Sequence, residues 1–85
     1  MRLSEVLKQE DFKNAGIEII SFYKTTQSEY AVLGRRGQPA LPGAGSTHLV
    51  EISEADRDPE IPRAVELSIK RRLGMKIPPF RSSSR

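Results

Sequence analysis

Cysteine is absent from this chain of 85 residues, and histidine occurs once, at His48. A chain without cysteine has neither disulfide bridges nor thiolate metal ligands, and a lone histidine excludes a His-rich zinc site. We therefore expect no metal and no cofactor. The lack of cysteine also fits a reducing cytosol, so the expected location is cytoplasmic.

Long apolar runs are missing as well. No stretch has the length of a signal-peptide core or a membrane span, so no membrane association is expected. A chain of 85 residues makes one small domain. Such a domain buries only about 60–65% of its unfolded surface, so its stability is marginal. A homodimer is therefore one expected way of gaining stability.

Charge is present and unevenly distributed. Residues 1–62 contain seven Lys and Arg against ten Asp and Glu, whereas residues 63–85 contain seven against a single Glu. The C-terminal quarter is thus strongly basic, whereas the rest of the chain is mildly acidic. A split of this kind indicates an anionic partner for the basic part, although a solvated basic helix face is the simpler interpretation.

The first half of the chain predicts a helix followed by two strands. Ser4 is a candidate N-cap for a helix over residues 4–15, broken or frayed near Gln9, and Gly16 is typical of a helix end. Residues 17–23 (IEIISFY) are rich in β-branched and aromatic side chains and predict a strand. Their imperfect alternation suggests burial on both faces. Residues 29–33 predict a second, antiparallel strand.

Glycine and proline concentrate between the second and third predicted strands. Residues 34–47 (GRRGQPALPGAGST) predict a long flexible loop, a kind of segment that is often functional. Residues 48–52 predict the third strand. The last residues, 81–85 (RSSSR), predict a disordered basic tail after a single domain over residues 1–80.

The basic quarter predicts a capped amphipathic helix. Asp58 is the expected N-cap of a helix over residues 59–73, which Gly74 ends. Apolar and small side chains at the i, i+3, i+4 spacing predict one buried stripe. The stripe comprises Ile61, Ala64, Val65, Ser68, Ile69 and Leu73. The predicted fold class is α+β, in the order α-β-β-β-α, with a three-stranded antiparallel sheet packed by two helices.

Cations at the C-terminal helix and at the start of the loop are the candidate contacts to nucleic-acid phosphates. They are Arg35, Arg36, Arg63, Lys70, Arg71, Arg72 and Lys76. Such contacts give binding that weakens with salt and carries no sequence preference. His48 is the candidate catalytic residue, because an imidazole can accept a proton near neutral pH.

Two stretches resemble a known family. Glu60-Ile61-Pro62-Arg63 with the following AVELSIKRRLGM, and the opening SEVLKQEDFKNAGIEII, are similar to the closing and opening patterns of the HicA-type mRNA interferase toxins. The resemblance implies a double-stranded-RNA-binding-like fold and contact with RNA. The family's catalytic histidine, at the start of its second strand, has no counterpart in residues 25–30 of this chain, and His48 lies one strand later.

These observations leave three functions open. The first is a small basic nucleic-acid-binding module, for RNA in preference to DNA, that contacts phosphates through its C-terminal helix. The second is a phage or mobile-element protein that docks on a host protein through the loop or an open sheet edge. The third is a small ribonuclease toxin that uses His48. The sequence identifies no reaction.

Overall fold

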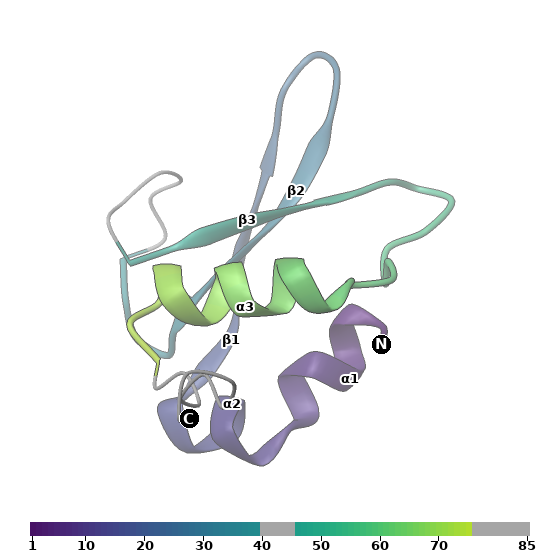
Figure 1. The fold of residues 1–85 in the computed structure, drawn as a ribbon. Coiled ribbons are helices and arrows are strands. Elements are labelled where there is room, and N and C mark those ends of the chain that lie inside the picture. Colours follow the sequence, from purple (N-terminus) through teal and green to yellow (C-terminus); the bar gives the residue numbers. More distant parts are fainter. Residues whose placement is uncertain (40–45, 76–85) are drawn as a thin grey trace.

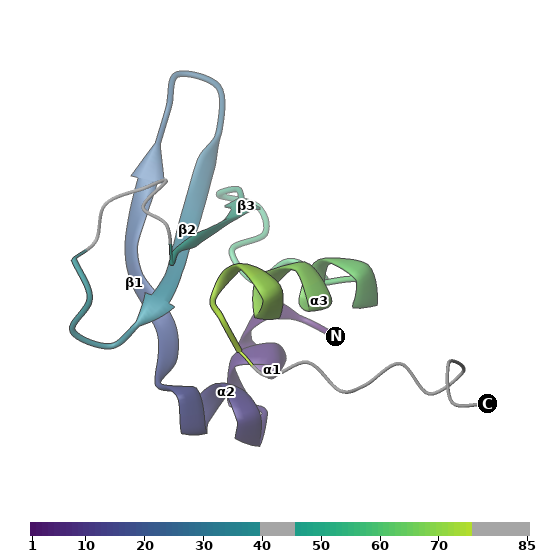
Figure 2. The ribbon, with the colours of Figure 1, turned by 60° about the vertical axis from the view of Figure 1, so that its left-hand side comes forward.

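The computed structural model describes residues 1–39 and 46–75 and confirms the α+β class (Figure 1). Residues 40–45 of the predicted loop, Lys76 and the predicted tail at 81–85 lie outside these residues. The elements are α1 (Leu3–Lys8), α2 (Glu10–Ala15), β1 (Ile17–Lys24), β2 (Glu29–Arg35), β3 (His48–Ile52) and α3 (Arg63–Arg72). The sheet is antiparallel in the order β1-β2-β3. The three helices lie on one side of it (Figure 2).

The first two strands are longer than the sequence predicts. β1 runs to Lys24 and β2 to Arg35, so the expected loop start at Gly34 is strand. A β-bulge interrupts the β1–β2 register between Ile19 and Ser21. The bulge adds one unpaired residue to β1, which accounts for the missing alternation in that strand. Beyond the helices the two strands continue as a projecting hairpin (Figure 2).

The helix expected over residues 4–15, with a break or frayed turn near Gln9, is two helices of six residues each. Gln9 separates them with an extended backbone (φ −62°, ψ 148°). In one continuous helix Leu3 and Phe12 would lie on opposite faces, roughly 180° apart. The break turns both side chains to the sheet, where they are 1% and 0% exposed. Burial of two large apolar groups thus outweighs helix continuity.

The C-terminal helix begins at Arg63, five residues after the predicted N-cap Asp58. Pro59 and Pro62 disfavour helical backbone at Asp58 and Ile61, the residues before them, so the helix does not begin at the predicted position. The segment before α3 pairs with the N-terminus: the Leu3 amide donates to the Pro59 carbonyl (2.9 Å), and the Ile61 amide donates to the Met1 carbonyl (2.7 Å).

The side chain of Asp58 binds the first turn of α1, near the N-terminus of the chain. Its carboxylate accepts hydrogen bonds of 2.7 Å from both the backbone amide and the hydroxyl of Ser4. Those bonds lower the pKa of Asp58, the hydroxyl contact most strongly. Ser4 is therefore inside α1 and not its N-cap, which is Arg2. A side chain from another part of the chain satisfies a free donor of the first helical turn.

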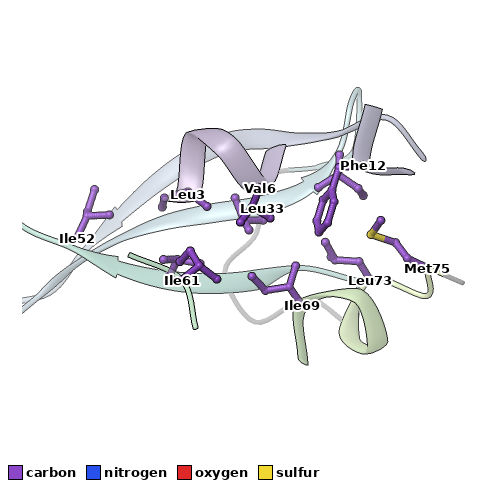
Figure 3. Close-up of a cluster of buried hydrophobic side chains, with 12 residues drawn as sticks. Leu3, Val6, Phe12, Leu33, Ile52, Ile61, Ile69, Leu73 and Met75 are labelled. Atoms are coloured by element: carbon purple, nitrogen blue, oxygen red, sulfur yellow. The ribbon is translucent and has the colours of Figure 1, made fainter. Parts of the chain in front are cut away.

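The buried face of α3 differs from the predicted stripe. Ile61, Ile69 and Leu73 are 3%, 0% and 1% exposed, as predicted, and they pack with side chains of α1, α2 and the sheet in one core (Figure 3). Ala64 and Ser68 are exposed. Their places on the buried face are taken by two charged residues, Glu66 and Lys70.

Gly74 ends α3 as predicted. Its φ of 70° lies in the left-handed region that glycine favours. The Gly74 amide donates to the Arg71 carbonyl (3.2 Å) and the Met75 amide to the Lys70 carbonyl (2.8 Å), which is the Schellman pattern. This turn brings Met75, 8% exposed, back into the core.

Candidate nucleic-acid interface

Lys70, one of the predicted phosphate contacts, is an interior residue. Its side chain is 7% exposed, and its ammonium lies 2.8 Å from the Asp11 carboxylate and 3.8 Å from the Glu66 carboxylate. The ammonium also lies 5.7 Å from the centre of the Phe12 ring. Gln9, at the break between α1 and α2, donates to Glu66 (3.2 Å). Lys70 therefore joins α3 to α2 and is not placed to meet a ligand at the surface.

The hydrogen bond from Lys70 is also the main cause of a pKa shift. It holds the pKa of Asp11 below its ordinary value, and the positive charge of the ammonium adds to the effect. Asp11 is half exposed, whereas Glu66 is buried. Of the two carboxylates, Glu66 therefore depends more on the neutralising charge of Lys70.

Two arginines at the end of β2 have partners within the protein. The Arg35 guanidinium donates to the Leu73 carbonyl (2.7 Å), where α3 ends. A cation at that position satisfies a free carbonyl and opposes the negative end of the helix dipole. Arg36 pairs with Glu18 (3.2 Å) across the sheet edge and is 73% exposed. Such an exposed pair contributes little to stability and leaves the Arg36 charge accessible to solvent.

The outward side of α3 carries the remaining predicted cations. Arg63 and Arg71 are exposed, and within residues 1–39 and 46–75 neither forms an ion pair. They are eight residues apart, which in a helix places them about 12 Å apart along the axis. Arg72 is exposed too, but its Nε donates to the Thr47 carbonyl (3.0 Å), so its orientation is fixed.

A surface cleft of about 440 Å³ lies between the end of α3 and the start of β3. We call it the α3–β3 cleft. Its lining residues are Thr47, His48, Leu49, Ser68, Arg71 and Arg72. The antiparallel register pairs His48 with Leu33, which belongs to the core, so the imidazole lies on the helix side of the sheet. The structure thereby brings His48 together with two of the predicted phosphate contacts.

His48 is half-buried, and its Nδ1 has no hydrogen-bond partner in the described part of the chain. Burial lowers the pKa of His48, and the positive charge of Arg72 lowers it further. The imidazole is therefore neutral at physiological pH. Its participation in RNA cleavage stays a prediction.

The electrostatics of the cleft balance two contributions. A helix C-terminus carries about half a negative charge, which by itself disfavours an anion. Arg71 and Arg72 bring two full positive charges to the same place, and Arg35 bonds the last turn directly. The sum is positive, so the cleft favours an anionic ligand.

Sequence reasoning missed two residues of the cleft. They are Ser68, whose spacing matches the predicted buried stripe, and Leu49, which lies in the predicted third strand. Ser68 is exposed because α3 is rotated so that the Lys70 side chain faces inward. A signal for this rotation is the pair Glu66 and Lys70, whose i, i+4 spacing lets them neutralise each other.

Among the described residues, no three His, Cys, Asp or Glu side chains gather into a possible metal site. None of the helices there has the length and apolar character needed to cross a membrane. Comparison of the chain with protein-family models, curated proteins and solved structures finds no match. The similarity to HicA-type toxins therefore stays a prediction.

Proposed function

We propose that this protein is a small nucleic-acid-binding module that contacts phosphates through the outward face of α3. The observation that carries the proposal is the position of Arg63 and Arg71. Both guanidinium groups are exposed on one helix, without ion pairs among the described residues. Arg72 extends this surface to the α3–β3 cleft.

Structured RNA is the preferred ligand in this proposal. The cations lie on a regular helix and not on an aromatic platform, an arrangement that suits the backbone of a folded strand. Proteins that bind A-form helices recognise mostly shape, phosphates and 2′-hydroxyls. The similarity of the sequence to a family with a double-stranded-RNA-binding-like fold agrees with this choice.

A charge-reversal experiment tests the proposal. Arg63→Glu/Arg71→Glu is compared with Lys8→Glu/Lys13→Glu, which changes the net charge equally at exposed sites on α1 and α2. Fluorescence anisotropy is measured with a structured RNA, duplex DNA and single strands at two salt concentrations. The Arg63/Arg71 variant is expected to bind far more weakly and to lower the salt slope by about two. The control is expected to retain most of the binding.

The proposal fails if wild-type protein binds none of these nucleic acids at low salt. It also fails if the two double variants lose affinity equally, because only the net charge would then matter. A preference for duplex DNA over RNA would keep the binding face and change the ligand.

A second candidate is docking on a host protein, and the projecting β1–β2 hairpin favours it. Phe22 and Tyr23 in this hairpin are 55% and 39% exposed, which is unusual for large apolar side chains. Tyr23 stacks on Tyr30 with ring centres 6.2 Å apart, and Arg57 lies 5.2 Å from the centre of the Phe22 ring. β1 is also an outer strand, open to strand addition.

The two candidates differ in what a pull-down recovers after nuclease treatment. Docking predicts one defined protein, captured by wild type and by the Arg63/Arg71 variant but not by Phe22→Ser/Tyr23→Ser. Nucleic-acid binding predicts that nothing specific remains after the nuclease.

A further inference from the structure

We propose that the α3–β3 cleft is a phosphoryl-binding site in which His48 takes up a proton when the anion binds. The inference rests on the proposed function, because it assigns one defined phosphoryl group to that surface. Because His48 takes part, binding at this site depends on pH, whereas binding by surface arginines alone does not.

The donors of the cleft suit a phosphoryl oxyanion. Arg72 uses its Nε on the Thr47 carbonyl (3.0 Å), so its guanidinium is already oriented. Arg71 adds a second guanidinium, and Ser68 adds a hydroxyl from the preceding turn of α3. Guanidinium groups match the oxygens of a phosphoryl group in pairs, which makes arginine well suited to such a site.

The size of the cleft indicates more than a bare anion. At about 440 Å³ it falls in the range of small-ligand sites, which is about 300–1,000 Å³. On the strand side the cleft is lined by Thr47, His48 and Leu49, and β3 is an outer strand of the sheet. A phosphoryl group at Arg71 and Arg72 therefore leaves room in the cleft for the group attached to it.

His48 gives the cleft its coupling to protons. The charged groups that face it are Arg71 and Arg72 from α3, whereas Leu33 opposite and the flanking Thr47 and Leu49 carry no charge. Without a ligand, burial and Arg72 both disfavour the imidazolium, so the pKa of His48 is lowered. A bound anion reverses the local charge and favours the protonated form. Binding and protonation therefore strengthen each other.

The first measurement uses the wild-type protein, in which His48 is the only histidine, so its imidazole signals need no further assignment. Imidazole ¹⁵N shifts are followed by NMR against pH, without and with sulfate, whose charge is constant over the range. Sulfate is expected to raise the pKa of His48, and its affinity is expected to be about threefold to tenfold higher near pH 5.5 than near pH 7.5. An unchanged His48 titration overturns the proposal.

Two variants separate the contributions. His48→Gln is expected to bind sulfate with the same affinity at both pH values. Ser68→Ala, an exposed substitution, is expected to bind several-fold more weakly but to retain the pH dependence. If His48→Gln keeps the wild-type pH dependence, another group takes up the proton and the proposal is wrong.

RNA distinguishes the sources of the phosphoryl group and the two levels of the proposal. A preference for 5′-phosphorylated over 5′-hydroxyl oligonucleotides assigns the cleft to a strand end, and equal affinity assigns it to an internal phosphodiester. RNA binding that needs Arg63 but never perturbs His48 keeps the proposed function and rejects this site. Absence of binding to RNA, duplex DNA and single strands, together with a sulfate-dependent His48 titration, rejects the proposed function and keeps the site.

Discussion

Lys70 and Arg71 are neighbours in sequence for which the structure predicts opposite consequences of the same substitution. The sequence predicts that both contact phosphates, whereas in the structure Lys70 is buried and Arg71 is exposed. Replacement of each by methionine removes the charge and keeps most of the apolar stem. We expect Lys70→Met to lose stability and Arg71→Met to lose RNA binding.

The size of the Lys70 effect follows from its partners. Glu66, also 7% exposed, lies 3.8 Å from the ammonium, and two unit charges at that distance attract by about 4 kcal/mol at an effective dielectric constant of about 20. Asp11 is nearer, at 2.8 Å, but is 46% exposed, and solvent screening limits its share to about 1 kcal/mol or less. The substitution also removes the cost of burying the ammonium, so the net loss is about 2–3 kcal/mol.

Urea unfolding, followed by circular dichroism, measures this loss. A domain of this length has a total stability of about 4–13 kcal/mol, so the change is large enough to resolve. Arg71→Met is the matched control, with an expected change within about 0.5 kcal/mol because its side chain is exposed. RNA affinity of folded Lys70→Met is expected to equal that of wild type. A Lys70→Met protein that is fully stable but binds RNA weakly refutes the argument.

Four further substitutions test other parts of the structure. Leu33→Ala, at a fully buried position, is expected to cost about 2–5 kcal/mol in urea unfolding. Gly74→Ala is expected to cost about 1 kcal/mol, because φ is 70° while the space around it is open. The hydrogen bond from Lys70 is the main cause that lowers the pKa of Asp11. The ionised Asp11 carboxylate therefore stabilises the fold above its ordinary pKa, and this stabilisation disappears as pH falls through the pKa of the folded state. Asp11→Asn is expected to flatten the acid limb of a stability–pH profile. Arg35→Met loses the 2.7 Å bond to the last turn of α3, with an expected drop of about 1 kcal/mol and a higher amide exchange rate there.

The strands and the C-terminal ends of the helices were the parts that the sequence predicted best. The β-branched run starting at Ile17 and the glycines at 16 and 74 act locally, through backbone preference and left-handed φ, and all three lie where expected. The start of α3 was misplaced because Asp58 has the chemistry of a cap for any nearby helix. Its carboxylate instead accepts a hydrogen bond from the first turn of α1, which is distant in sequence.

The candidate interface was less predictable because charge alone does not say which cations are free. Among the predicted cations in the described residues, Lys70 pairs with Glu66 on the buried side of α3. Arg35 donates to the Leu73 carbonyl, which is distant from it in sequence. The only local difference between Arg71 and Lys70 is the Glu66 carboxylate four residues before Lys70, and this spacing alone does not show that the pair is buried. The rotation of α3 about its axis decides which of the two is buried, and the packing of α3 in the core sets that rotation.

The sequence alone determined that this is a small α+β protein with a basic C-terminal helix, because backbone preferences, glycine ends and charge composition are properties of short segments. Tertiary structure decided which way that helix faces. It placed Lys70 inside and Arg63 and Arg71 outside, and it brought His48 to the end of α3. These positions depend on the long-range pairing of β3 with β2 and on the buried contacts of α3, neither of which a short segment encodes.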